Sequence, residues 1–279
     1  MPNLVFLNNK YIPFKDAKIP IEDRGFQFSD SVYEVVKIIN KKMLDIDFHM
    51  RRLKYSTSEL NFNFKVNSKL FNKIFQNLII KNKLSNGIIY LQITRGVQSR
   101  EHAYKKKLKP NVIVYTAKKK FNLPNKNYKG YKAITYPDIR WGRPDIKTTS
   151  LLANIIAATE ANKKGAYETI LVKGKKITEA AHSNVWIVKG DKIITHPANK
   201  EILKGVTRTV LINIIHSLGL KLIEKEFSLK ELYKSDEVFI TSSGSLVAPI
   251  TQIDSIKINN KKIGKITKAL ALSFYKSII

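Results

Sequence analysis

The chain has 279 residues and a mass of 31.9 kDa, and 43% of its residues are hydrophobic, so it can build two domains of ordinary size with sizeable cores. It contains no cysteine, which excludes disulfides, thiolate metal ligands and a cysteine nucleophile. The net charge of +28 comes mainly from 42 lysines spread along the chain; nucleic-acid readers rely on arginine, of which there are 8, so we expect no specific nucleic-acid partner.

The N-terminal half is predicted to begin with a hairpin, because the turn Asn8-Asn9-Lys10 separates two short apolar runs. Aromatic and β-branched residues then favour one long strand over 26–39. Hydrophobic periodicity predicts the elements that follow: helices over 49–60 and 68–80, and strands over 89–93 and 112–115.

Residues 118–130 (KKKFNLPNKNYKG) have no periodicity and are rich in Lys, Asn, Pro and Gly, which is typical of a domain boundary. We therefore expect an N-terminal α+β domain over 1–118, a linker over 119–130 and a C-terminal α+β domain over 131–279. The latter is predicted to contain strands over 133–136, 169–172, 177–188, 192–195 and 237–241, and helices over 151–162, 207–218 and 265–277. Ser228 with Glu231 predicts a capping box that starts a further short helix.

No targeting or membrane segment is evident in the sequence. The apolar run Leu4 to Leu7 is too short for a signal peptide, and no stretch approaches the roughly 18 apolar residues of a membrane span. We expect a cytoplasmic protein with no membrane partner.

One lysine stands apart from the lysine-rich background. Lys147 has 14 lysine-free residues before it and 15 after it, and no other lysine is so isolated on both sides. Lys147 is the one lysine in the segment Pro144 to Asn154. We expect this segment to be buried in part and its amine to have a function.

Several basic residues lie at positions suited to anion binding. His49 and Arg52 lie in the first turns of a predicted helix, where a bound anion would relieve the conflict between cations and the helix dipole. Arg100 and His102 follow a strand and could grip a carboxylate. Each pair also has an ordinary explanation, because solvated basic turns and loops are common.

Three further residues suit the binding of a charged ligand. Glu179 lies on a predicted strand, where its ordinary role would be as a cross-strand partner for lysine. Thr207 opens a helix after a glycine, and Ser243 lies in a Ser-Ser-Gly-Ser loop; such hydroxyls and backbone N–H groups cradle phosphate, although small polar loops are common. The sequence has no Walker motif, no GxGxxG, no GxSxG and no metal-spaced cluster of His and Asp, so we expect no metal site. His196 and His216 are expected to be structural or exposed.

Taken together, these motifs resemble the fold-type IV pyridoxal-phosphate enzymes (class IV aminotransferases), and most closely the D-amino-acid (D-alanine) transaminases. The matching motifs run in the family's order over essentially the whole chain: EDRGFQFSDSVYEV, FHMRRL, DIKTTSLLAN, GAYETILVKGKKITEAAHSNVWIV and ILKGVTR. The resemblance implies a two-domain α+β fold with the cofactor between the domains, and a homodimer whose partner loops help to close the site.

The resemblance also implies a role for each matching residue. Lys147 would form the Schiff base with pyridoxal 5'-phosphate, and Glu179 would pair with the pyridinium N–H. The other cofactor contacts, to the phosphate and the ring, would come from Arg52, Leu203, Val206, Thr207 and Ser243. The substrate carboxylate would be held by Tyr33, Arg100 and His102.

The subfamily depends on fewer residues than the family. Branched-chain L-amino-acid transaminases and aminodeoxychorismate lyases share Lys147, Glu179 and the phosphate contacts, so these functions remain alternatives. The Arg-x-His spacing after ITRG favours D-amino acids. The chain departs from the usual pattern at Ser29, Ser31, Ala181, His182 and Gly244. Of these, we expect His182 to be within reach of the cofactor or the substrate by the resemblance alone, which leaves the substrate side-chain preference open.

We therefore expect a transaminase that moves the amino group of a D-amino acid, such as D-alanine, to a 2-oxo acid, such as 2-oxoglutarate. The alternative from another class is a lysine-rich, non-catalytic polyanion-binding protein. Such a diffuse lysine surface should lose affinity steeply as salt rises.

Overall fold

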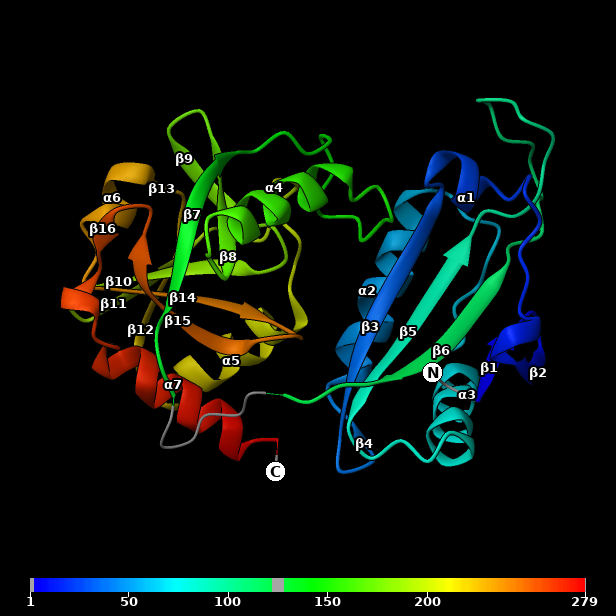
Figure 1. Cartoon of the computed structure of the whole chain (residues 1–279), viewed down its shortest axis with the longest axis horizontal. Coiled ribbons are helices and arrows are strands. Elements are labelled where there is room, and N and C mark those ends of the chain that lie inside the picture. The colour runs from blue at the N-terminus through cyan, green and yellow to red at the C-terminus, as the bar shows by residue number, and fades with distance from the viewer. Residues whose placement is uncertain (1–2, 122–127, 279) are drawn as a thin grey trace. The chain divides into compact units, whose positions relative to one another are not determined.

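The computed structural model describes residues 3–121 and 128–278, which form two compact units (Figure 1). The first unit consists of Met1–Phe121 and Ile146–Ser150, and the second of Asn122–Asp145 and Leu151–Ile279. The segment that carries Lys147 thus packs with the first unit, whereas the sequence placed it in the C-terminal domain. Residues 122–127 of the expected linker lie outside the described residues.

The first unit is built on one antiparallel sheet. Its strands are β1 (Leu4–Leu7), β2 (Lys10–Pro13), β3 (Ser31–Ile39), β4 (Lys42–Met43), β5 (Gly87–Thr94) and β6 (Val112–Lys118), in the order β2-β1-β6-β5-β3-β4. Its helices are η1 (Phe14–Asp16), α1 (Arg24–Phe28), α2 (Ile46–Glu59) and α3 (Ser68–Lys81). These elements confirm the predicted hairpin, both predicted helices and the two later strands.

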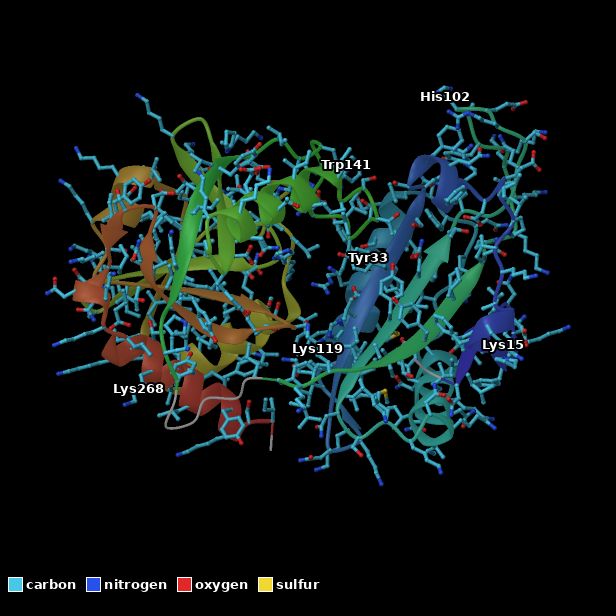
Figure 2. The ribbon with its side chains drawn as sticks, in the orientation of Figure 1. Lys15, Tyr33, His102, Lys119, Trp141 and Lys268 are labelled. Atoms are coloured by element: carbon cyan, nitrogen blue, oxygen red, sulfur yellow. The ribbon has the colours of Figure 1, made fainter. Side chains whose placement is uncertain are left out.

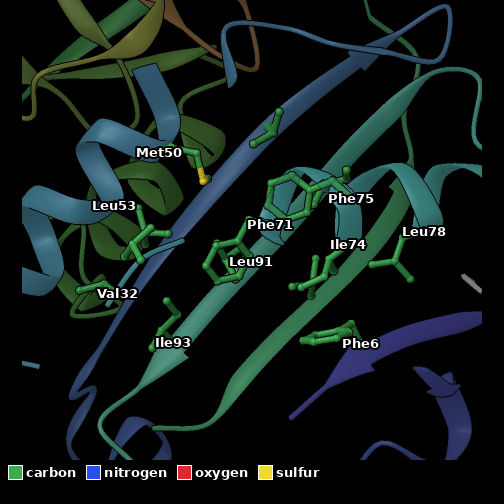
Figure 3. Close-up of a cluster of buried hydrophobic side chains, with 14 of the residues drawn as sticks. Phe6, Val32, Met50, Leu53, Phe71, Ile74, Phe75, Leu78, Leu91 and Ile93 are labelled. Atoms are coloured by element: carbon green, nitrogen blue, oxygen red, sulfur yellow. The ribbon is translucent and has the colours of Figure 1, made fainter. Parts of the chain in front are cut away.

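Helices α2 and α3 cover one face of this sheet, and the hydrophobic core lies between the sheet and the two helices (Figure 3). The alternation of β5 directs Leu91 and Ile93 toward the helices. There they meet Leu53 of α2 and Phe75 of α3, both fully buried. The opposite face of the sheet is left to carry polar and aromatic side chains.

The prediction of one strand over 26–39 was wrong in its first part, which forms α1 before β3 begins. The Asp23 side chain caps the helix by accepting from the N–H of Gly25 at 2.8 Å. Ser29 then ends it in the left-handed conformation, with φ of 54°. Local capping therefore outweighed the β propensity of Phe26 and Phe28.

The second unit contains a larger, mixed sheet. Its strands are β7 (Tyr131–Pro137), β8 (Glu168–Lys173), β9 (Lys176–Ala180), β10 (Asn184–Lys189), β11 (Lys192–Thr195), β12 (Lys221–Glu224), β13 (Phe227–Ser228), β14 (Glu237–Ser242), β15 (Leu246–Ile253) and β16 (Ile256–Lys257). Its helices are α4 (Leu152–Lys163), α5 (Val206–Ser217), α6 (Leu229–Tyr233), η2 (Asn259–Lys261) and α7 (Lys265–Lys276). The predicted capping box at Ser228 is confirmed.

This sheet curls around a core of its own. Its order is β12-β11-β10-β14-β15-β7-β8-β9-β13, and the strands at its two ends are joined by Lys225 and Glu226 alone. The two edges must therefore come close together. Ile170, Val185 and Ile240 lie in the cluster along the inner side, while α5 and α7 pack on Trp186 and neighbouring residues outside (Figure 1).

This sheet differs from the sequence prediction in several places, and strands β12, β13, β15 and β16 were not predicted. The expected strand over 177–188 is broken between β9 and β10, because the chain turns sharply where the N–H of Ala180 donates to the carbonyl of Ser183 at 2.7 Å. Strand β15 was missed because Pro249 is typical of a loop. Pro249 is tolerated because it faces Phe239 of β14, while the ladder to β7 begins only at Ile250.

Among the described residues, no helix has both the length and the apolar character needed to cross a bilayer.

Candidate active site

Lys147 lies on a short segment that pairs with β3. The N–H of Tyr33 donates to the carbonyl of Lys147 at 3.0 Å, and the N–H of Thr149 donates to that of Ser31 at 3.2 Å. Val32 and Thr148 form an isolated antiparallel bridge between these two bonds. The backbone around Lys147 is therefore fixed as if it were one more short strand.

The Lys147 amine is held over an aromatic ring. Its Nζ lies 4.2 Å from the ring centroid of Tyr33, and its backbone N–H donates to Ser56 Oγ at 3.1 Å. Ser56 belongs to α2 and is buried. Two predicted site residues, Lys147 and Tyr33, are thus in contact, and α2 helps to position the lysine.

A chain of hydrogen bonds fixes the sheet face around Tyr33. Ser31 Oγ lies 2.6 Å from Thr149 Oγ1 and accepts from Gln92 Nε2 at 3.0 Å. The Tyr90 hydroxyl donates to Gln92 Oε1 at 2.9 Å, and the Tyr90 ring stacks on Tyr33 with centroids 5.7 Å apart. Tyr33 therefore has little freedom beside Lys147.

Glu34, on the opposite face of β3, ties α2 to the sheet. It accepts two hydrogen bonds from Arg52, each at 2.8 Å, and one from Nδ1 of His49 at 2.7 Å. Burial raises the pKa of the Glu34 carboxyl, but the charges and hydrogen bonds of Arg52 and His49 outweigh burial and lower that pKa to about 2. Arg52, the predicted phosphate ligand, is thereby fixed in direction.

Arg100 and His102 lie in the loop between β5 and β6. The Arg24 guanidinium holds this loop by donating to the carbonyls of Glu101 at 2.7 Å and His102 at 2.9 Å. Phe28 lies under both predicted residues, 4.8 Å from the Arg100 guanidinium and 5.6 Å from the His102 ring. Figure 2 places His102 well apart from Tyr33. One chain does not bring His102 to Tyr33.

Glu179, in the second unit, is a buried carboxylate with several partners. Asn184 Nδ2 donates to Oε2 at 2.9 Å, the N–H of Leu203 donates to Oε1 at 3.0 Å, and Arg140 forms a very short ion pair with Oε1. Burial raises the pKa of Glu179, while the Arg140 charge and the Leu203 N–H stabilise the carboxylate and oppose that shift.

Arg140 joins this carboxylate to a second one. It donates through Nε and Nη2 to Asp138, at 2.9 and 2.7 Å, and Thr178 Oγ1 also donates to Asp138 at 2.7 Å. Burial raises the pKa of Asp138, but the hydrogen bonds and charge of Arg140 outweigh it and lower the pKa. Burial lowers the pKa of the Arg140 guanidinium, but its hydrogen bond to Asp138 and the charge of Glu179 raise that pKa by more. The net shift is upward, so the guanidinium stays charged.

Asn184 connects Glu179 to the start of α5. Besides its bond to Glu179, its Nδ2 donates to the carbonyl of Leu203 at 2.9 Å. A Cβ on Gly205 would lie 2.1 Å from Asn184 Oδ1, so only glycine permits this approach. Val206 and Thr207, the predicted phosphate contacts, follow Gly205 and form the buried first turn of α5.

Ser243 and His182 occupy loops of the second unit. Ser243 lies in the turn between β14 and β15, where Ser242 and Ser245 are hydrogen-bonded at 2.8 Å. His182 donates from Nδ1 to Glu168 at 3.0 Å, and its side chain is 60% exposed. The expected role of His182 at the cofactor or the substrate stays a prediction.

The geometry joins the predicted residues into two sets. Lys147, Tyr33 and Arg52 are linked through β3 and α2 in the first unit, and Glu179 is linked to Leu203 in the second. Sequence reasoning missed three partners: Glu34, Arg140 and Asn184. The spacing Asp-x-Arg at 138–140 was the available signal for Arg140, because it suits a local ion pair.

The comparisons with known proteins decide the family. The model of the amino-transferase class IV family matches residues 31–253. The chain belongs to the class IV aminotransferases. It is 36% identical to a D-alanine aminotransferase of Listeria monocytogenes, covering 98% of this chain and 96% of the relative, and 33% identical to one of Staphylococcus aureus, covering 98% and 97%.

Solved structures agree on the fold of this aminotransferase. A structure of the branched-chain aminotransferase of Escherichia coli has a TM-score of 0.91 at 22% identity, covering 99% of this chain and 94% of that one. The branched-chain aminotransferase of Thermobaculum terrenum, in its PLP-bound holo-form, has a TM-score of 0.87 at 20% identity, with coverage of 99% and 94%. The expected α+β fold-type IV architecture is confirmed.

Class IV aminotransferases use pyridoxal 5'-phosphate, and the residues present suit that group. The positioned amine of Lys147 suits the aldehyde of the cofactor, and the buried carboxylate of Glu179 suits its ring nitrogen. Helix α5 begins after Gly205 without a side-chain cap, and its N–H groups suit the phosphate. Asn184 and Arg140 fix the direction of that carboxylate.

Proposed function

We propose that this aminotransferase transfers the amino group of a D-amino acid, with D-alanine as its representative, to a 2-oxo acid such as 2-oxoglutarate. The observation that carries the proposal is the match to relatives named D-alanine aminotransferase over nearly the whole length of both chains. The branched-chain enzymes resemble it at lower identity.

Lys147 acts as the acid and base of the reaction. The cofactor supplies an electron sink for the charge left when the substrate Cα loses its proton. Lys147 Nζ, fixed beside the Tyr33 ring by the pairing of its segment with β3, would accept that proton and later release it. Loss of the β3 pairing would leave this amine on a flexible loop.

The remaining residues of the site would bind the cofactor and polarise its ring. Glu179, as a carboxylate held by Arg140, would keep the ring nitrogen of the cofactor protonated. Leu203 would pack on the cofactor ring. Phosphate binding falls to residues that offer N–H groups, hydroxyls or a guanidinium: Arg52, Val206, Thr207 and Ser243.

The substrate carboxylate is held by Tyr33 of one protomer and by Arg100 and His102 of another. This assignment is supported by the distance in Figure 2 between Tyr33 and the loop tip that carries His102. It makes the enzyme a homodimer whose sites are incomplete in a single chain. A cytoplasmic location stays part of the proposal.

The test begins with the cofactor and then separates the substrates. The purified protein should be yellow, and borohydride reduction followed by peptide mapping should label Lys147; a label on another lysine would overturn its role. D-alanine, L-leucine and aminodeoxychorismate are then assayed side by side. Turnover of D-alanine alone supports the proposal, while turnover of either other substrate supports the corresponding alternative. A colourless protein that binds nucleic acid at physiological salt would favour polyanion binding.

A further inference from the structure

A second polar cluster lies beside the Glu179 network and uses none of its side chains. His196, Glu201 and Glu226 belong to the second unit, and their ligand atoms all lie within 4.8 Å of one another. The sequence predicts no metal site here, because Glu226 is remote in sequence from His196 and Glu201 and meets them only through the pairing of β11 with β12.

The pairing of β11 with β12 brings the cluster together. These strands are parallel, with Thr195 opposite Glu224, so their carboxyl ends meet at one edge. The N–H of Lys225 donates to the carbonyl of Thr195 at 3.0 Å and extends this register. His196 follows Thr195 and Glu226 follows Lys225, so these two residues are neighbours at the ends of the two strands.

His196 presents an unshared nitrogen to the two carboxylates. Its Nδ1 donates to the carbonyl of Pro197 at 2.9 Å, because a carbonyl can only accept. Its side chain is 2% exposed, and its Nε2 has no hydrogen-bond partner among residues 3–121 and 128–278. Glu201 Oε2 is 3.6 Å from that nitrogen. An orienting bond on Nδ1 with Nε2 directed at carboxylates is the arrangement of a metal-binding imidazole.

We propose that His196, Glu201 and Glu226 bind a divalent cation of the zinc class, with one imidazole nitrogen, two carboxylates and water as ligands. Ligand atoms in a tetrahedral zinc site lie about 3.4 Å apart, so the pair of His196 and Glu201 needs little adjustment. The Glu226 side chain is 38% exposed and can move closer.

Two lysines now neutralise the carboxylates of the cluster, and a bound divalent cation could take over that role. Lys173 pairs with Glu201 at 3.0 Å, and Lys176 pairs closely with Glu226. Both lysine side chains are 61% exposed, so they can turn into solvent when a divalent cation takes their place. A cation there would brace residues 196–203, whose Glu201 carbonyl accepts from Arg140 at 3.2 Å.

The experiment measures zinc binding to the full-length holoenzyme after removal of metals by a chelator and desalting. Calorimetric titration with zinc chloride should give one tight equivalent, and zinc should raise the Tm by about 5 °C at a hundredfold excess over Kd. Glu226→Gln, which changes an exposed side chain, should weaken binding at least tenfold. His196→Asn, which keeps a donor for Pro197 but removes Nε2, should do the same.

Glu160→Gln is the matched control, because Glu160 also forms an exposed ion pair with a lysine, Lys163, at 2.8 Å. It should bind zinc as the parent does. A holoenzyme that retains no zinc, or variants at Glu226 and His196 that both bind it unchanged, would overturn the proposal. Transaminase activity is not the readout, so the result is independent of the proposed reaction.

Discussion

At the scale of single residues, Glu34 is the group on which the first unit depends most. Its carboxylate is fully buried and receives every hydrogen bond from His49 and Arg52 described above. Replacing it by Gln leaves the Arg52 guanidinium paired to a neutral amide, so we expect Glu34→Gln to lower the free energy of unfolding by about 3 kcal/mol at pH 7. Urea unfolding measures this loss, with Glu160→Gln as an exposed control.

The pH dependence of this stabilisation has a definite sign. The pKa of Glu34 is about 2 in the folded protein against 4.5 ordinarily, so its contribution is fully present above pH 4.5 and is lost as pH falls toward 2. The parent should lose stability over that window more steeply than Glu34→Gln. Parallel curves for the two proteins would show that Glu34 is not the responsible group.

Lys37 destabilises the folded protein at neutral pH, although its pH dependence has the same sign as that of Glu34. Its side chain is buried over the Phe121 ring, and burial, aided by Lys119, lowers its pKa from 10.5 to about 7. The unfolded chain therefore binds more protons between pH 7 and 10.5, so stability should rise with pH across that range. Lys37→Met should be more stable than the parent at pH 7, by a few kcal/mol at most, and the gap should narrow by pH 10. Urea unfolding at both values tests this, and an unchanging gap would contradict it.

The residue scale also shows where sequence reasoning ends. Lys147, Tyr33 and Glu179 were predicted as site residues because family motifs carry them and one of them interrupts a lysine-free stretch, and their roles stay predictions. The Asp-x-Arg spacing could signal only the local pair of Arg140 with Asp138, and nothing signalled Asn184, because the contacts of both with Glu179 arise only when distant segments meet. The isolation of Lys147 suggested a useful amine, and its position over Tyr33 gives that amine a direction.

At the scale of elements, the start of α5 depends on one glycine. Gly205→Ala would place a Cβ 2.1 Å from Asn184 Oδ1, forcing the first turn of α5 away from Asn184 and Leu203. We expect affinity for pyridoxal phosphate to fall at least tenfold, because that turn supplies the proposed phosphate contacts. Cofactor absorbance after dialysis measures the loss. Gly142→Ala is the control, because open space surrounds Gly142, and equal losses in both variants would refute the assignment.

Elements were predicted well where periodicity dominates and less well where a local turn decides. Helices α2 and α3 followed from their apolar spacing. Helix α1 and the break between β9 and β10 depend on single hydrogen bonds at Asp23 and Ala180, which no periodicity reports. The β15 strand was hidden by Pro249, whose tolerance depends on which neighbour lies beside it.

At the scale of the whole molecule, the separation of Tyr33 from the loop tip at His102 makes a prediction about assembly. Lys147→Ala and Arg100→Ala should each abolish most D-alanine turnover when alone. If Arg100 serves the site of its partner, a mixed dimer of the two variants holds one site with both defects and one site with neither. Partial denaturation of an equal mixture, followed by refolding with cofactor, should therefore restore about a quarter of the parent activity, because half of the dimers are mixed.

This complementation distinguishes two arrangements that a single-variant assay cannot separate. If Arg100 served the site of its own chain, every site in the mixture would lack either the lysine or the arginine, and no activity would return. Arg24 anchors the backbone of the same loop through Glu101 and His102, so Arg24→Ala should behave like Arg100→Ala in the mixture. Recovery with Arg100→Ala but not with Arg24→Ala would show that Arg24 is needed for the fold or the site of its own chain and not only for this loop. Recovery with both would assign the whole loop to the partner's carboxylate site.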